Sequence, residues 1–217
     1  MFLFSWRVGI PVLLGTLIAA SANASPIFVN NFSFETLPAS GLPFACGVGC
    51  SFSIGPIAGW VNAGGGQFQP GAPANTNDFN SVPDGTTVAF LNGGTITQTV
   101  VPTVQAGVTY TLMVDLGVRK GFVDPGSIAL VVNGNVYSGA GILPSSGNWS
   151  TFTATYTGLL ADVGQAITIQ LASPGIQGEF DNVRLSDNAG PVPEPATSAL
   201  IGLGVVAIGL FSRRKKV

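Results

Sequence analysis

The sequence predicts an all-β fold, a two-sheet jelly-roll-like sandwich, over residues 25–186. Short runs rich in Val, Ile, Thr and aromatic residues recur between turn residues, which is typical of such sandwiches. Asn133-Gly134 separates "ALVV" from "NVY", and this pair tolerates the positive φ that a two-residue hairpin requires. No helical periodicity of useful length occurs between residues 25 and 190.

The strand pattern gives ten elements in order. We expect strands at 27–34, 60–62, 87–91, 95–101, 108–116, 127–132, 135–137, 151–156, 166–171 and 179–186, with turns at Asp84-Gly85 and Asn92-Gly93-Gly94. The apolar alternation changes parity at Asn30-Asn31 in the first strand and at Asp181-Asn182 in the last. Because alternation has a period of two, each change predicts a bulge or similar irregularity.

The composition of the middle region excludes several classes of function. Residues 25–190 contain nine acidic and three basic side chains, so nucleic acid is not expected as a partner. The 217-residue chain contains no histidine, which excludes Ser-His-Asp and Cys-His nucleophile systems. Cys46 and Cys50 are the only cysteines, and in an exported chain such a pair predicts a local disulfide.

The N-terminal segment has the pattern of a signal peptide, residues 1–24. A short stretch with one cation, Arg7, precedes a mostly apolar run at 8–20. Ala22-Asn23-Ala24 then fits the small-x-small site of signal peptidase, which would cut between Ala24 and Ser25. The middle of the chain is therefore expected outside the cytoplasm.

The C-terminal segment has three parts in a fixed order. A linker, residues 187–195, contains Pro193-Glu194-Pro195, which cannot be helical. An uncharged run from 196 to 211 follows, and we expect a transmembrane helix over 196–212. Arg213, Arg214, Lys215 and Lys216 lie in a basic tail, 213–217, expected on the cytoplasmic side. A permanent single-span anchor remains an alternative to a removable one.

These three parts resemble the PEP-CTERM sorting signal of Gram-negative bacteria. The resemblance implies that an exosortase-type enzyme reads the tail and removes it near Pro193–Pro195. It also implies transient anchoring in the inner membrane, then release to the cell surface or extracellular matrix, with exopolysaccharide as a partner.

The middle region resembles the galactose-binding-like sandwich of carbohydrate-binding modules. The matching stretches are "NNFSFETLP", "GW" at 59–60, "YTLMVDLG" and "EFDNVRLS". The resemblance implies a structural Ca²⁺ held by acids of the first and last strands, here Glu35 and Asp181, with Asn30 beside them. Irregular backbone at both strands would free carbonyls for a cation that prefers six to eight oxygen ligands. The alternative is that both acids are solvated or bind turns.

Taken together, these patterns predict a non-catalytic, exopolysaccharide-associated surface protein that binds glycans weakly. Its candidate ligand-binding side chains lie in the uncharged segment 62–85: Gln67, Phe68, Gln69, Asn75, Asn77 and Phe79. One alternative is a glycoside hydrolase using Glu179-x-Asp181, although Arg184 stands where a second glutamate of that motif would fall. The other alternative is a purely structural surface protein.

Overall fold

The computed structural model describes residues 24–70, 78–123 and 126–189. In these ranges it has ten strands and one short 3-10 helix. They are β1 (Ser25–Ile27), β2 (Phe44–Gly47), β3 (Cys50–Phe52), β4 (Val61–Gln69), β5 (Val88–Thr103), β6 (Thr109–Gly117), β7 (Ser127–Val132), β8 (Asn135–Ser138), β9 (Trp149–Thr157), η1 (Leu160–Asp162) and β10 (Ala166–Asp187). The all-β prediction is confirmed.

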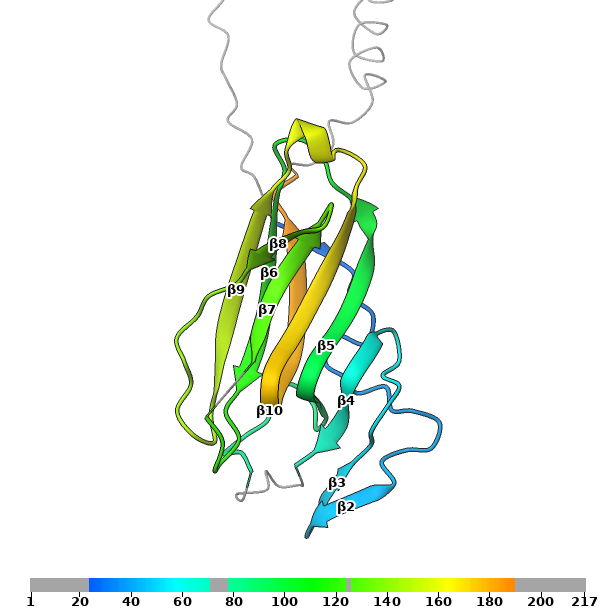
Figure 1. Ribbon diagram of the computed structural model, residues 1–217, viewed down its shortest axis with the longest axis vertical. Coiled ribbons are helices and arrows are strands. Elements are labelled where there is room, and N and C mark those ends of the chain that lie inside the picture. Colours follow the sequence, from blue (N-terminus) through cyan, green and yellow to red (C-terminus); the bar gives the residue numbers. More distant parts are fainter. Residues whose placement is uncertain (1–23, 71–77, 124–125, 190–217) are drawn as a thin grey trace, which may run out of the picture.

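Strand β10 joins the two layers of the sandwich (Figure 1). Its first part pairs with β5 and β7, whereas its last part pairs with β6 and finally with β1. Register shifts near Ser173 and Gly178 allow the strand to bend. Hydrogen bonds therefore connect the layers through one long strand, whereas two separate sheets were expected.

The hydrophobic interior has two parts because β5 presents both of its faces to apolar neighbours. Ala89 and Leu91 point into the main core between the layers. Val88 and Phe90, on the other face of β5, pack with Phe68 and Phe79 in a smaller second cluster. This second cluster forms one side of the candidate functional site described below.

Local predictions were confirmed where backbone conformation dictated them. Asn133 and Gly134 have φ of 49° and 76° and join β7 to β8. The parity change near Asn182 is a register shift in β10, and Asn182 has φ of 51°. The predicted strand over 27–34 does not form: β1 ends at Ile27, and Asn31, with φ of 49°, lies in the turn that follows.

Strands β5 and β10 are each one long strand where the sequence predicts two shorter ones. The expected turn at Asn92-Gly93-Gly94 lies inside β5, where it faces register shifts in β4 and β10. Strands β4 and β10 pair with β5 on either side of this stretch, so its backbone groups form hydrogen bonds without a local turn. Strands β2 and β3 were not expected.

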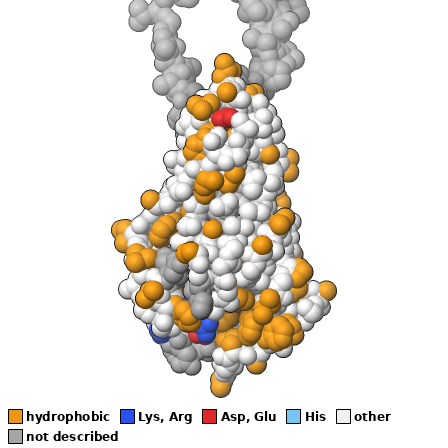
Figure 2. All heavy atoms as spheres, viewed as in Figure 1, with side chains coloured by type: hydrophobic (Ala, Val, Ile, Leu, Met, Phe, Trp, Pro, Cys, Tyr) orange, Lys and Arg blue, Asp and Glu red, His pale blue; other side chains and the backbone are white. Residues whose placement is uncertain are grey.

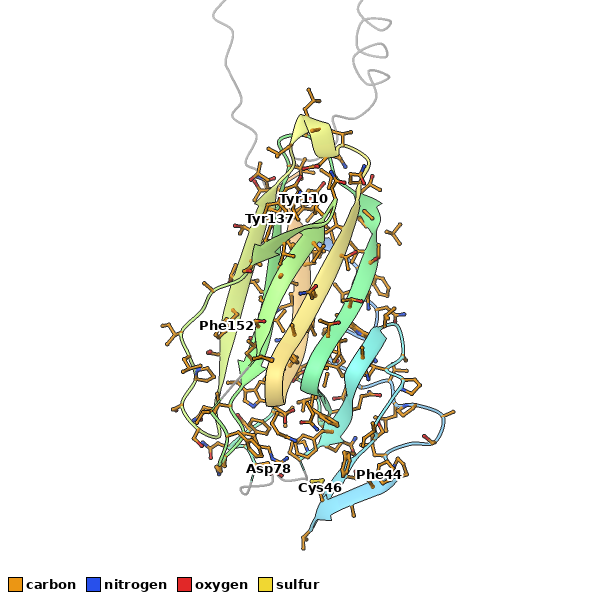
Figure 3. The ribbon with its side chains drawn as sticks, in the orientation of Figure 1. Phe44, Cys46, Asp78, Tyr110, Tyr137 and Phe152 are labelled. Atoms are coloured by element: carbon orange, nitrogen blue, oxygen red, sulfur yellow. A yellow bond between two sulfur atoms is a disulfide. The ribbon has the colours of Figure 1, made fainter. Side chains whose placement is uncertain are left out.

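The predicted signal peptide and transmembrane helix fall outside the described residues. Over 24–70, 78–123 and 126–189, no helix is long and apolar enough to cross a membrane. Both ends of the described domain lie beside each other, since Ser25 pairs with Asp187. Helix η1 lies at this same end, and the labelled Asp78, Cys46 and Phe44 lie at the opposite end (Figure 3).

Candidate functional site

A cavity of about 190 Å³ lies at the end of the domain away from the chain termini. It is built from β2, β3, β4, β5, the segment after β6 and the irregular part of β10. Its wall is mainly aromatic and aliphatic, and hydrophobic side chains gather over this end of the molecule (Figure 2). The lining residues are Cys46, Phe52, Ile54, Phe68, Phe90, Asn92, Arg119 and Gln177.

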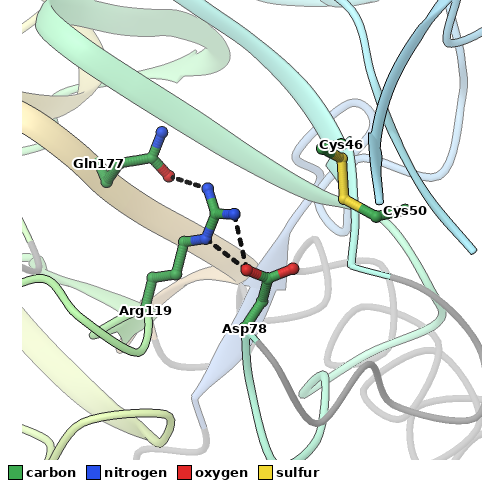
Figure 4. Close-up of a disulfide and its surroundings, with 5 residues drawn as sticks. All are labelled: Cys46, Cys50, Asp78, Arg119 and Gln177. Carbon is green, nitrogen blue, oxygen red and sulfur yellow. Dashed lines mark hydrogen bonds and ion pairs between the residues drawn. A yellow bond between two sulfur atoms is a disulfide. The ribbon is translucent and has the colours of Figure 1, made fainter. Parts of the chain in front are cut away.

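Among the described residues, Arg119 is the one cation in the cavity wall, and its position is fixed on several sides (Figure 4). Its Nε and NH2 atoms both lie 2.6 Å from Asp78 Oδ1. Its NH1 donates to Gln177 Oε1 at 2.9 Å. The guanidinium lies 5.0 Å from the ring centroid of Phe68 and 5.5 Å from that of Phe122. The pairing with Asp78 leaves this part of the wall close to neutral.

Gln177 reaches Arg119 from a strained stretch of β10. Its φ is +69°, which a residue with a side chain rarely adopts. Its backbone N–H donates to Asn92 Oδ1 at 3.2 Å, within the register shift of β10 against β5. Such backbone outliers tend to occur at functional sites, and here the outlier aims an amide into the cavity wall.

Glu179 is a buried acid on the cavity side of β10. Its Cα partners are Phe90 on β5 and Gly117 on β6, so its side chain shares a face with Phe90. Gly117 has no side chain, and Phe79 and Trp149 pack closely over it. These aromatic neighbours help to seal Glu179, which is fully buried.

The environment of Glu179 favours its neutral form. Neither carboxyl oxygen has a hydrogen-bond partner within the described part of the chain. Burial raises the pKa of Glu179 well above its usual range; Arg119 opposes this rise, and Asp78 adds to it. A carboxylic acid that stays protonated at neutral pH can donate a proton.

The predicted glycan-binding side chains are not arranged for shallow surface binding. Residues 62–69 of this segment belong to strand β4, and Gln67, Phe68 and Phe79 are buried. The Gln67 amide donates to the backbone carbonyls of Phe34 and Thr36. Gln69 Nε2 donates to Thr87 Oγ1 at 3.0 Å. Asn75 and Asn77 lie outside the described residues.

The structure brings two of the three predicted calcium ligands to one turn, residues 84–87. Glu35 Oε1 accepts hydrogen bonds from the backbone N–H groups of Thr86 and Thr87, at 2.8 and 2.6 Å. Asp181 Oδ2 accepts one from the backbone N–H of Asp84 at 2.9 Å.

Asn30, the third predicted ligand, forms its backbone hydrogen bonds elsewhere. Its backbone N–H and C=O bind the side chain of Gln98, at 2.8 and 2.9 Å. Among the described residues there is no group of three or more His, Cys, Asp or Glu side chains able to hold a metal.

Cys46 and Cys50 are joined by a disulfide that closes the β2–β3 hairpin. Cys46 lines the cavity, so the bond also fixes part of the wall. Arg119, Asp78 and Gln177 were not predicted as functional residues. The sequence offers one signal for Arg119: the middle region has only three cations, and a buried acid is commonly paired with a cation.

An all-β sandwich with an apolar cavity and a buried acid behind its wall defines a class of protein able to hold a small, mainly apolar molecule. The comparisons give the class a family. The HpiC1 cyclase family model matches residues 25–186, and the chain belongs to that family. The PEP-CTERM protein-sorting motif matches residues 191–216, which confirms the sorting signal and indicates export with membrane-associated sorting. Comparison with curated proteins finds no match.

Solved structures of cyclases share this fold. A cyclase from Fischerella sp. in its apo form is 24% identical, with a TM-score of 0.63 over 79% of this chain and 100% of its own. The Stig cyclase Fisc from Fischerella sp. TAU, in complex with (3Z)-3-(1-methyl-2-pyrrolidinylidene)-3H-indole, is 22% identical, with a TM-score of 0.61 over 76% and 98%. A cyclase from Fischerella sp. TAU in complex with 4-(1H-indol-3-yl)butan-2-one is 23% identical, with a TM-score of 0.60 over 78% and 100%.

Membership of a cyclase family overturns two predictions. The prediction of a non-catalytic glycan-binding protein is wrong, and so is the prediction that the chain is not an enzyme. The absence of histidine excludes nucleophile triads, but a cyclisation needs no nucleophilic side chain. The findings give no support to exopolysaccharide as a partner.

Proposed function

We propose that the domain cyclises an uncharged, indole-like molecule in the cavity, with Glu179 as the proton donor. The observation that carries this proposal is the buried carboxyl of Glu179, without a hydrogen-bond partner in the described residues, on the aromatic side of β5. Family membership supports cyclisation, and the indole-bearing ligands of two related structures support the substrate class.

The chemistry of the wall favours a neutral substrate. Arg119 is neutralised by Asp78, and the remaining polar wall residues, Asn92 and Gln177, carry no charge. No second cation lines the cavity within the described ranges, so a phosphorylated substrate would lack partners.

Proton transfer from Glu179 to an unsaturated carbon would place a positive charge on the substrate. The rings of Phe52, Phe68 and Phe90 offer π faces that stabilise a nearby cation. A second double bond of the substrate then attacks this cation, so one carbon–carbon bond forms and one π bond is consumed. Loss of a proton from a neighbouring carbon to the Glu179 carboxylate restores the acid, and the product is an isomer of the substrate.

Substrate must reach Glu179 past a side chain of the wall, since the carboxyl is sealed from solvent. Arg119 is a wall residue whose charge already acts on Glu179, so a substrate would reach the carboxyl by displacing the contacts of Arg119 with Asp78 and Gln177. Catalytic contacts often form only in the complex with substrate.

The cavity should bind 4-(1H-indol-3-yl)butan-2-one, measured by isothermal titration calorimetry. Ile54→Trp places a bulky ring at an exposed position of the wall and should weaken binding at least about tenfold, or ~1.4 kcal/mol. Ile142→Trp is the matched control, because Ile142 is also an exposed isoleucine but does not line the cavity. Absence of binding to the wild type, or equal binding by both variants, would contradict the proposal.

We further propose that an exosortase-type enzyme removes the sorting tail near Pro193–Pro195, leaving the domain outside the inner membrane. The sorting motif at 191–216 supports this. Mass spectrometry of protein from its native host should find a C-terminus between Pro193 and Pro195 and an N-terminus at Ser25. Mature protein that retains Arg213–Val217 would support a permanent anchor instead.

Calcium remains a proposal, with Glu35 and Asp181 as its carboxylate ligands. Both acids surround the 84–87 turn, and each Asp181 oxygen accepts one backbone N–H, from Asp84 and Asn182, which leaves lone pairs free. Asn30 is left out, since its carbonyl binds Gln98. A bound cation would offset the negative charges near Asp181.

A further inference from the structure

The end of the domain opposite the cavity exposes several large apolar side chains. We call it the tip, defined by the exposed side chains of Val101, Leu159, Leu160 and Val163. Leu160 is 84% exposed and Val101 is 92% exposed. Within the described residues, the charged side chains at this end are those of Asp162 and Asp187.

Neither acid gives the tip a strong surface charge. Asp162 is buried, where its oxygens accept hydrogen bonds from Tyr156 and Asn133. Asp187 is half-buried in β10 and accepts a hydrogen bond from the backbone of Ala189. The ion pairs Arg119–Asp78 and Arg184–Asp115 belong to other parts of the domain.

Hydrogen bonds place the tip beside the point where the chain leaves the domain. Asn188 and Thr109 exchange two hydrogen bonds, at 2.7 and 3.1 Å. The adjoining segment is bonded to the η1 loops, through Gly107 to Gly158 at 2.8 Å and Val104 to Gln165 at 2.9 Å. The tip and the exit of the C-terminal tail therefore lie on one end of the sandwich (Figure 1).

The sequence beyond this exit fixes the distance to the membrane. The apolar run begins at Ala196, seven residues after Ala189, and so lies within roughly 25 Å of the domain even when the linker is fully extended. A tether this short gives the tip a high effective concentration at the surface that holds the tail, so even a weak contact is populated.

We propose that the tip is a membrane-contacting surface, which rests on the bilayer while the sorting tail is inserted. The four apolar side chains enter the headgroup region, and because the described part of this end exposes no cation, the contact does not depend on a specific lipid charge. The domain is then held with its cavity facing away from the bilayer, and the linker with Pro193–Pro195 lies at the membrane surface.

Site-specific fluorescence quenching tests this contact on the full chain in vesicles of phosphatidylethanolamine and phosphatidylglycerol. Both native cysteines are in the disulfide, so a single added cysteine can carry an environment-sensitive dye. A label at Leu160→Cys should be quenched several-fold more by brominated lipid than a label at Val48→Cys. Val48 is 97% exposed and lies in the β2–β3 turn at the cavity end.

Two further labels complete the test. A label at Leu203→Cys, in the apolar run, should be strongly quenched and reports insertion of the tail. Adding Leu159→Ser and Val163→Ser should reduce quenching at residue 160 without affecting residue 203. Equal quenching at 160 and 48, or no quenching at 203, would overturn the proposal. Cavity binding of the indole probe is measured separately, so failure here leaves the proposed enzyme function intact.

Discussion

The Glu179→Gln variant is expected to lose turnover by a factor of roughly 10²–10⁴, the usual contribution of general acid catalysis. Glutamine keeps the shape of the side chain but carries no transferable acidic proton. Incubation with uncharged indole-bearing alkenes, followed by liquid chromatography and mass spectrometry, should reveal wild-type product as an isomer of unchanged mass. The variant should still bind 4-(1H-indol-3-yl)butan-2-one, since the aromatic wall is untouched.

The pH profile separates a proton donor from a structural residue. Burial raises the pKa of Glu179, so the acid stays protonated to higher pH than an ordinary carboxyl, and the wild-type rate should fall as pH rises through that pKa. Asp187→Asn is the matched control, since this carboxyl lies at the tip, and it should leave the rate unchanged. Turnover by Glu179→Gln at the wild-type rate would remove Glu179 from the mechanism.

Without calcium, the free energy of unfolding is expected to fall steeply as pH rises from about 4 to 8. Burial, with nearby Asp84 and Asp115, raises the pKa of Asp181 from 3.8 to about 8, against two backbone hydrogen bonds that lower it. The folded state therefore retains a proton that the unfolded state has lost. Stability is complete below pH 3.8 and declines through this window, by an amount on the order of 5 kcal/mol.

Chemical denaturation at pH 5 and pH 8, in chelator and in calcium, measures this dependence. Asp181→Asn cannot ionise, so in chelator it should lose much less stability than the wild type between the two pH values. Calcium should restore the wild type at pH 8, because a cation compensates the ionised carboxylate, and should not restore the variant. Parallel pH profiles for wild type and variant would show that ionisation of Asp181 does not lower the free energy of unfolding. Identical wild-type curves with and without calcium would contradict the proposed calcium site.

Features that depend on local backbone preference could be predicted from the sequence. Asn133-Gly134 specifies a hairpin by itself, because few other pairs accept two positive φ angles. The irregularity at Asp181-Asn182 is visible because it disrupts an otherwise regular alternation. The sorting tail is equally legible, since its three parts lie in consecutive residues.

Features that depend on partners far along the chain could not be predicted from the sequence. Nothing near Asn92-Gly93-Gly94 shows that β4 and β10 carry β5 through this stretch without a turn. The pairing of Arg119 with Asp78 joins residues 41 apart, and Gln177 comes from a third segment. Glu179 was noticed only as half of a hydrolase motif, because its isolation among aromatic side chains arises from packing and not from its neighbours in sequence.

The pairing of β1 with the last residues of β10 sets the order in which an exported chain can fold. The strand partners of Ser25–Ile27 are Leu185–Asp187, so the first strand cannot pair until almost the whole domain has crossed the membrane. Closing so long a loop is slow, and unpaired strands remain exposed in the meantime. Once Asp187 has emerged, the sorting motif at 191–216 follows almost directly. Completion of the domain and arrival of the sorting tail at the membrane are thus nearly simultaneous, so that a sorting enzyme acting at once would meet a chain still closing its first strand.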